Sequence, residues 1–346
     1  MARRSLAAKL AQERNLVIVK PHTLSVRRRR CGKGFRFVTE SGARLADAGR
    51  IAWLKSLAVP PAYVNVRYAA AENAHLQAIG EDAAGRLQYR YHPKWAEVRE
   101  ALKARRLAGL AKALPAIRRA VGRALGMQQA DRHLAVAAVI ELVCLTAIRA
   151  GSEEYARERG TRGATTLLKS NVHPSEGNRL TLCFKAKGGK KIIKVVRNGR
   201  LHAALSRLLQ LPGRRVFQYR EPGGEVRVVR AADVNAFLRE VAGRPISLKD
   251  FRTLVASAHA LDALAATAPA TSASRRRRQV REAVIEVAEE LANTPTVCRT
   301  SYVHSAVIEA FENGVLKRVV RKKTKSPVAQ AQLVARVISK VRRASR

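Results

Sequence analysis

Residues 134–148 read L-A-V-A-A-V-I-E-L-V-C-L-T-A-I, and this run sets the fold of the larger part of the chain. It is the longest apolar stretch, and its only charged residue is Glu141. A helix that spans a membrane needs about 20 apolar residues. The run is too short and too polar at its centre for that role, so we predict a helix buried in the core of a helical domain.

Helical spacing of apolar residues continues on both sides of this run. One stretch departs from it: residues 179–196 alternate as R-L-T-L-C-F-K-A-K-G-G-K-K-I-I-K-V-V, which predicts a β-hairpin with its turn at Gly188-Gly189. Lys187 would then sit at a strand end, beside a tight turn. The helices are predicted at 96–124, 131–149, 231–242, 250–266 and 276–292.

The chain before Pro93 has a different sequence pattern, in which short segments typical of strands are separated by turns such as Ser41-Gly42 and Ala84-Gly85. We therefore predict an α+β protein of two domains. A small sheet-rich N-terminal domain would cover residues 1–92, and a mainly α-helical domain with one β-hairpin would cover 93–346. The strands of the first domain are predicted at 16–19, 35–38, 63–68, 75–79 and 87–91.

The charge of the chain points to a polyanionic partner. Sixty-seven Lys and Arg stand against 26 Asp and Glu, a net charge of +41 that is spread along the whole length. Nucleic acid is favoured as the partner over an anionic membrane or a ribosomal role. The basic clusters Arg27–Arg30, Arg275–Arg278 and Lys317–Lys325 are, taken alone, typical of solvated faces or tails.

No cofactor or metal is expected. The chain has no G-x-x-x-x-G-K-[ST] loop, G-x-G-x-x-G turn or H-E-x-x-H helix, so nucleotide cofactors and zinc hydrolysis lack their usual motifs. Lys9 and Glu13 interrupt the N-terminal apolar residues before they reach signal-peptide length. The cysteines show no C-x-x-C pairing and no histidine at ligand spacing, so we expect reduced thiols in a cytosolic protein. They are Cys31, Cys144, Cys183 and Cys298.

Four polar residues have simple structural interpretations when each is taken alone. Arg149 would lie in the last turn of the apolar helix, where its positive charge interacts favourably with the helix dipole, and Gly151 would be the C-cap. Arg252 would be an exposed arginine in the first turn of a helix, and Lys187 an exposed hairpin lysine. Asn293 would simply end a helix.

Together, however, the strings around these residues resemble one family. I-R-A-G-S-E-E-Y, F-K-A-K-G-G-K, K-D-F-R-T-L-V-A-S and N-T-P-T-V-C-R-T-S-Y occur in the order and spacing of the type IB DNA topoisomerases. Three further strings resemble the poxvirus-like bacterial branch: V-P-P-A-Y-V-N-V from Val59, H-L-Q-A from His75 and G-R-L-Q-Y-R-Y-H-P from Gly85. The resemblance covers nearly the whole chain.

The resemblance implies a chemistry for the site residues. Tyr302 would attack a DNA phosphodiester, form a 3′-phosphotyrosyl link and release a 5′-hydroxyl, and the reverse attack would reseal the strand without ATP or metal. Arg149 and Arg252 would bind the non-bridging oxygens, and Lys187 would protonate the leaving 5′-oxygen. Asn293 stands where viral and eukaryotic members have histidine, and it donates a hydrogen bond without carrying charge.

The resemblance also implies DNA contacts outside the catalytic centre. Gln88, Tyr89 and Tyr91 match positions that contact the major groove in viral relatives. The alternative is a strand with Tyr89 and Tyr91 on one buried face. Tyr155 matches a DNA-proximal position or simply packs. Ala186 departs from the family, since many members have glycine before the lysine, which puts the fine geometry of the hairpin in doubt.

The implied protein is a monomeric, cytoplasmic and nucleoid-associated enzyme that clamps duplex DNA, preferably supercoiled, and relaxes both signs of supercoil. Two alternatives remain open. A tyrosine recombinase shares the fold and the set of catalytic residues Arg, Lys, Arg and Tyr. Its usual motif around the second arginine is H-x-x-R, whereas this chain has Lys249 three residues before Arg252. A non-enzymatic architectural or ribosomal protein, suggested by the basic tail from Lys317, would bind without covalent trapping.

Overall fold

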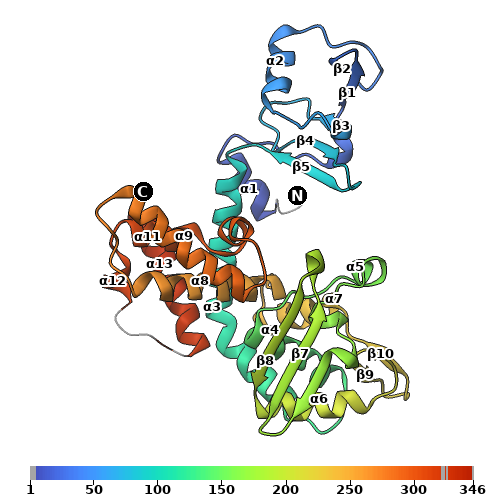
Figure 1. The fold of residues 1–346 in the computed structure, drawn as a ribbon, viewed down its shortest axis with the longest axis vertical. Helices are drawn as coiled ribbons and strands as arrows, with labels where there is room; N and C mark the ends of the chain where they lie inside the picture. The colour runs from blue at the N-terminus through green and yellow to red at the C-terminus, as the bar shows by residue number, and fades with distance from the viewer. Residues whose placement is uncertain (1–4, 321–323, 325, 345–346) are drawn as a thin grey trace. The chain divides into compact units, whose positions relative to one another are not determined.

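The computed structural model describes residues 5–320, 324 and 326–344. The chain divides into two compact units, Met1–Lys103 and Ala104–Arg346, and the boundary falls inside the long helix α3, Trp95–Leu125 (Figure 1). Each unit is described by itself.

The first unit is built on a five-stranded antiparallel sheet in the order β2-β1-β3-β4-β5. One face of the sheet is covered by α2, Ala48–Ser56, whose Leu54 packs with Val26, Phe37 and Tyr68. A short helix, α1 (Leu6–Gln12), packs against the start of α3, and a 3₁₀ turn follows at Pro21–Thr23. The strands are β1 (Val26–Cys31), β2 (Gly34–Val38), β3 (Val64–Tyr68), β4 (Leu76–Glu81) and β5 (Leu87–Tyr91).

Four of the five predicted strands are confirmed, and one is wrong. Residues 16–19 form no strand, since Val17 makes only a single bridge, to Ala74. The missing strand is β1, V-R-R-R-R-C, which the prediction treated as a basic cluster. Arginine tolerates a strand because its aliphatic stem can lie along the sheet while the guanidinium stays in water.

The second unit is mainly helical, with one three-stranded sheet in the order β6-β7-β8 and a small β9-β10 pair. Its helices are α4 (Arg132–Thr146), α5 (Glu153–Glu158), α6 (Gly199–Gln210), α7 (Ala231–Ala242), α8 (Leu248–Ala265), α9 (Ala273–Glu290), α10 (Pro295–Val297), α11 (Ser305–Glu312), α12 (Leu316–Val319) and α13 (Pro327–Ala344). The strands are β6 (Val172–Ser175), β7 (Arg179–Lys185), β8 (Lys191–Arg197), β9 (Gln218–Arg220) and β10 (Val226–Val228). Short 3₁₀ turns lie at Ala164–Thr166 and Lys169–Asn171.

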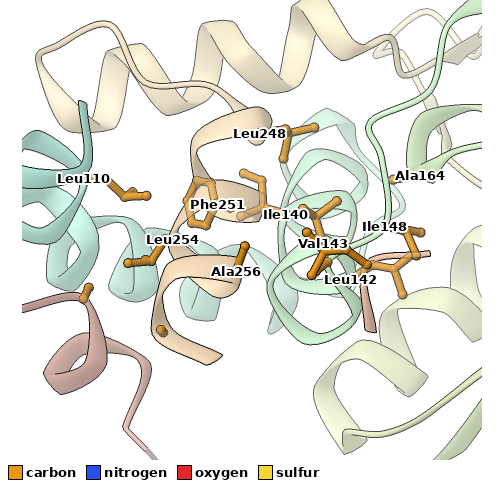
Figure 2. Close-up of a cluster of buried hydrophobic side chains, with 14 of the residues drawn as sticks. Leu110, Ile140, Leu142, Val143, Ile148, Ala164, Leu248, Phe251, Leu254 and Ala256 are labelled. Carbon is orange, nitrogen blue, oxygen red and sulfur yellow. The ribbon is translucent and has the colours of Figure 1, made fainter. Parts of the chain in front are cut away.

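Helix α4 lies at the centre of this unit, and the prediction of a buried core helix is confirmed. Its residues from Leu134 to Val143 are all buried. Ile140 and Val143 of α4 lie near Leu248 and Phe251 of α8 in the same apolar cluster (Figure 2). Each such side chain contributes about 1.5–3 kcal/mol by leaving water. Helix α4, which precedes Arg149, and helix α8, which carries Arg252, are therefore held in one core.

Glu141, the charged residue within the apolar run, is 2% exposed. A buried carboxylate is tolerated only when it is paired. Arg118 of α3 forms an ion pair with it, and Asn198 Nδ2 donates a hydrogen bond to Oε1 at 3.2 Å. Glu141 thus ties α4 to α3 and to the residue that caps α6.

The predicted β-hairpin is confirmed. Strands β7 and β8 pair from Arg179↔Arg197 to Lys185↔Lys191, and the turn Lys187–Gly189 joins them. Gly188 and Gly189 have φ of +79° and +78°, a conformation that favours glycine. Ala186 has φ −97° and ψ −179°, which any residue adopts, so alanine fits this hairpin without strain.

The remaining helices form a bundle in which α8 contacts α9, α11 and α13 (Figure 1). In the described part of the chain, no helix combines the length and the apolar character that crossing a membrane requires. Within the predicted basic cluster Lys317–Lys325, residues 321–323 and 325 lie outside the described residues.

Candidate active site

Arg149 lies just beyond the core helix, not within its last turn. Helix α4 ends at Thr146, and Ala147 takes the C-cap position with φ +51°. The interpretation of Gly151 as the C-cap is therefore wrong. Arg149 is half-buried and lies in the irregular segment between α4 and α5.

The backbone around Arg149 is held by a second segment. Ala164 N donates to Arg149 O at 2.7 Å, and Thr165 N donates to Ala150 O at 2.8 Å. Gly163 permits this close approach, because a Cβ there would lie 2.6 Å from Arg149 O and 2.5 Å from Gly151 N. The backbone that carries Arg149 is thus locked against the turn that follows α5.

Arg252 sits just after the first turn of α8, which begins with a capping box in which Ser247 N donates to the Asp250 carboxylate at 2.8 Å. The default interpretation of an exposed arginine is wrong, since Arg252 is 3% exposed. Its guanidinium donates to Ala147 O and, at 3.2 Å, to Leu291 O. Arg252 thereby joins the ends of α4 and α9 to α8.

Tyr302 closes a π-helical segment, Cys298–Tyr302, in which Val303 N donates to Cys298 O at 2.9 Å. Such π segments are rare in proteins, and those that occur often lie at functional sites. The Cζ atom of Arg252 lies 5.0 Å from the centroid of the Tyr302 ring, within cation–π range. Ser257 Oγ donates to Tyr302 O at 3.2 Å and accepts from His304 N at 3.1 Å, so α8 fixes the backbone of the tyrosine from both sides.

Asn293 lies in the loop after α9 and contacts Arg149, whose guanidinium donates to Asn293 Oδ1. The amide Nδ2 of Asn293 is buried and has no hydrogen-bond partner among the described residues, and the same holds for Nε of Arg252. A buried donor without a partner is costly. Two such donors, one on the arginine that lies over the Tyr302 ring and one on the amide that contacts Arg149, are suited to an oxygen-rich anion.

The electrostatics of the site also favour an anion. A small cavity of about 20 Å³, large enough for about one water molecule, adjoins the site but is not lined by Tyr302. Its lining includes the two arginines, the cations Arg162 and Lys194 and one carboxylate, Glu290. Burial lowers the pKa of Arg252; Tyr302 opposes this shift, and Arg149 adds to it by repulsion. An anion bound by both guanidiniums would relieve the repulsion between them. No cluster of candidate metal ligands occurs within the described residues.

Lys187 stands apart from the other four site residues. It is exposed at the β7–β8 turn and, in the described part of the chain, makes no hydrogen bond to any of them. Two neighbouring lysines nonetheless link its hairpin to the end of α9. Lys194 Nζ pairs with Glu290 Oε1 at 2.5 Å, and Lys190 Nζ donates to Asn293 O at 3.4 Å.

In the first unit, Tyr89 and Tyr91 lie on an exposed face of β5, with 47% and 39% of their surface accessible. The alternative that they share a buried face is therefore wrong. Their rings stack with centroids 6.1 Å apart, and the ring of Tyr91 also stacks on Trp95 at 6.4 Å. Gln88 is half-buried and donates to Asp82 Oδ2 at 2.9 Å, so part of its amide is already engaged.

Tyr155 is also exposed, at 38%, and sits in α5. The guanidinium of Arg159 lies 5.1 Å from the centroid of its ring. The alternative of a packed tyrosine is therefore wrong, and the ring forms an exposed pair with a cation.

Several residues that shape the site were not predicted from the sequence. Gly163 fixes the backbone of Arg149, Ser257 fixes that of Tyr302, and the Lys194–Glu290 pair holds the hairpin. Ser257 belongs to the string K-D-F-R-T-L-V-A-S, so its place beside the motif was the one available signal. Gly163 and Glu290 lie outside all four strings and carry no such signal.

Two models of known protein families match parts of the chain. A family model described as the catalytic core of eukaryotic DNA topoisomerase I matches residues 93–327, a range that contains Arg149, Lys187, Arg252, Asn293 and Tyr302. The model of the N-terminal domain of bacterial DNA topoisomerase IB matches residues 34–82. Gln88, Tyr89 and Tyr91 fall between the two matches.

A curated relative gives the same answer. DNA topoisomerase 1B of Acanthamoeba polyphaga mimivirus is 31% identical over 267 residues, which cover 75% of this chain and 79% of the relative. These matches confirm the family resemblance over the alternatives of a tyrosine recombinase and a non-enzymatic architectural protein. The protein is an enzyme that acts on DNA, and the chain belongs to the type IB DNA topoisomerases.

Proposed function

We propose that the protein relaxes supercoiled duplex DNA by cutting one strand and resealing it through Tyr302. The phenol oxygen forms a bond to the phosphorus, the bond to the 5′-oxygen breaks, and a 3′-phosphotyrosyl link results. The 5′-hydroxyl later attacks the same phosphorus and expels the tyrosine. The covalent link conserves the energy of the original bond, so no ATP is needed for resealing. The cationic side chains would stabilise the phosphate charge, a role that a metal ion has in other enzymes.

Arg149 and Arg252 would bind the non-bridging oxygens, whose charge grows in the transition state. The single observation that carries this assignment is the position of the Arg252 guanidinium, which is buried and lies 5.0 Å from the Tyr302 ring. The partnerless donor of Asn293, held beside Arg149, would supply one further hydrogen bond to the phosphate.

Lys187 would act as the general acid that protonates the departing 5′-oxygen. Its support is its place on an exposed glycine turn, from which a long side chain can reach a bound DNA strand. The contacts of Lys190 and Lys194 with the α9 end direct this turn toward the loop that carries Asn293.

Gln88, Tyr89, Tyr91 and Tyr155 would contact the duplex outside the cleavage point. The exposed, stacked rings of Tyr89 and Tyr91 support this role, since such rings can pack on DNA and their hydroxyls can bind phosphate. The protein would act as a monomer in the cytoplasm, on both positive and negative supercoils.

The test is relaxation of negatively and positively supercoiled plasmid in EDTA without ATP. We expect relaxation of both by the natural protein and none by Tyr302→Phe, which should still bind DNA. The natural protein, trapped by denaturant, should carry a covalently bound strand through its 3′ end. Relaxation by Tyr302→Phe, or a requirement for a paired recombination site, would contradict the proposal.

A further inference from the structure

The first unit carries a groove that the proposed chemistry does not use. Strands β1 and β3 pair only at Val26↔Tyr68 and Arg27↔Arg67. Beyond these pairs the groove, of about 630 Å³, is lined by Arg27–Arg30 on one side and by Val64–Arg67 on the other. Asn65, with φ +52°, marks the irregular course of β3 at this point.

One of the four arginines in β1 has a structural role. Arg28 donates to the carbonyl oxygens of Val59 and Pro60 at 2.9 Å and of Tyr63 at 2.7 Å. Its guanidinium also lies 4.2 Å from the centroid of the Phe35 ring. Arg28 therefore fastens the segment before β3 to β1 and builds the wall of the groove.

The other arginines of the groove are not used in this way. Arg27, Arg29, Arg30 and Arg67 are exposed, and within the described residues none of them has an ion pair or a side-chain hydrogen bond. Like charges stand directly opposite each other across the strands, at Arg27↔Arg67 and at Arg29↔Arg36. Such pairs destabilise a sheet unless an anion lies between them.

The only acid among the described lining residues is Glu81, and it is already engaged. Asn65 Nδ2 donates to Glu81 Oε2 at 3.0 Å. The carboxylate is therefore held by Asn65 and, within the described residues, forms no ion pair with the arginines, although its charge still lowers the positive potential of the groove.

We propose that this arginine groove, defined by Arg27, Arg29, Arg30 and Arg67, binds the phosphodiester backbone of nucleic acid. The guanidinium fork matches the oxygens of a phosphate. The cationic row continues past the groove to Arg36 on β2, and a row of this kind fits a polymer better than a single small anion. In the sheet order, β3 and β4 separate β1 from β5, so the groove is a contact additional to that of Gln88, Tyr89 and Tyr91 (Figure 1).

The test measures binding and not cleavage, so it is independent of the chemistry at Tyr302. In the full-length Tyr302→Phe protein, the affinity for a long linear duplex is followed over a salt series. The triple variant Arg27→Gln, Arg29→Gln, Arg67→Gln should flatten the slope of log K against log salt by roughly 2 to 3, about 0.9 for each lost phosphate contact. Glu81→Gln should bind more tightly at each salt concentration.

Two controls make the outcome decisive. Arg275→Gln, Arg277→Gln, Arg281→Gln removes the same charge from the exposed side of α9 and should change the slope less. The melting temperature of the groove variant without DNA should be equal to or above that of the parent, because repulsion is removed. An unchanged slope, or an equal change in the control, would overturn the proposal. Loss of inorganic tripolyphosphate binding with an unchanged DNA slope would show a small-anion site instead, and would overturn it too.

Discussion

The guanidinium of Arg149 donates a hydrogen bond to the side-chain oxygen of Asn293. A guanidinium can only donate, so this contact fixes the orientation of the amide: the oxygen faces Arg149, and the NH₂ group is left as a donor. That NH₂ group is buried and has no partner among the described residues. Asn293 can thus donate to a phosphate oxygen in the proposed reaction, although it carries no charge.

Replacing Asn293 should separate the loss of a neutral donor from the gain of a repulsive charge. Asn293→Ala removes one uncharged hydrogen bond, and we expect a loss of cleavage rate well below the order of 10² to 10³ that one transition-state donor can supply. Asn293→Asp should be far slower, because a carboxylate cannot donate and would repel the phosphate. Single-turnover cleavage of a duplex measures both. A loss for Asn293→Ala equal to that for Arg252→Ala would contradict this ranking.

The pH profile offers a second test of the same position. A neutral amide does not titrate, so Asn293 should contribute equally at pH 5.5 and 7.5. Asn293→His would introduce a group with an ordinary pKa of about 6.5, which donates with a positive charge only below that value. The cleavage rate of the variant, relative to the natural protein, should therefore fall as pH rises through this range. A flat ratio would show that the side chain does not face the phosphate.

Arg252 should resist even its conservative replacement. Its guanidinium donates to two backbone carbonyls, Ala147 O and Leu291 O, while lying over the Tyr302 ring. A lysine ammonium is smaller and lacks the planar fork, so Arg252→Lys cannot satisfy both carbonyls and reach the phosphate. We expect cleavage to fall on the order of 10²-fold or more for Lys as well as for Ala. Thermal unfolding of each variant provides the control for folding, and near-natural cleavage by Arg252→Lys would contradict the geometry.

The sequence predicted those parts of the fold that repeat a simple pattern. The apolar run ending at Ile148 and the alternation around Gly188-Gly189 depend only on local periodicity, and both are confirmed. Strand β1 was missed because four consecutive arginines carry no alternation, and its pairing with β2 and β3 is decided by tertiary contacts.

The same distinction holds at the candidate site. The family resemblance pointed to Arg252, but only the packed structure shows it buried between two helix ends. Gly163 could not be identified from the sequence, because its constraint comes from a backbone that lies twelve residues away. Contacts of this kind depend on three-dimensional approach, which periodicity does not encode.

The ion pair between Lys194 and Glu290 should matter for the proton transfer that we propose for Lys187. Lys194 belongs to β8 of the hairpin, and its Nζ lies 2.5 Å from Glu290 Oε1 at the end of α9. Lys194→Met would loosen the hairpin and would leave Arg149, Arg252 and Tyr302 unchanged, although Lys194 lines the same small cavity as the two arginines. We expect cleavage of an ordinary duplex to slow severalfold, and cleavage of a duplex with a 5′-thiol leaving group, which needs little protonation, to be nearly unchanged.

The matched control for this experiment is Lys191→Met, which removes an exposed lysine from the same strand. It should affect neither substrate. Lys187→Ala should show the largest difference between the two leaving groups. If Lys194→Met slows both substrates equally, the ion pair supports the fold in general and does not position the general acid. If Lys187→Ala does so, the general-acid assignment itself is wrong.

Substitution of Gly163 should be tolerated as poorly as substitution of a site residue, although Gly163 touches no DNA in the proposed reaction. A Cβ at this position would meet Gly151 N at 2.5 Å and Arg149 O at 2.6 Å, and backbone atoms cannot move aside cheaply. We expect Gly163→Ala to destabilise the protein by about 1–3 kcal/mol, as overpacking does. Gly223→Ala is the matched control, since a Cβ there meets no atom within 4 Å.

Gly163→Ala should slow cleavage by displacing Arg149, because the added Cβ would clash with the backbone that carries this arginine. A double-mutant cycle tests this coupling. Gly163→Ala alone should slow cleavage, but it should add little when Arg149 has already been replaced by alanine. Equal effects in the two backgrounds, measured at a temperature where all four proteins are folded, would show that Gly163 acts elsewhere. Non-additivity would instead identify the contact between Gly163 and Gly151 as the feature that places Arg149 beside Asn293.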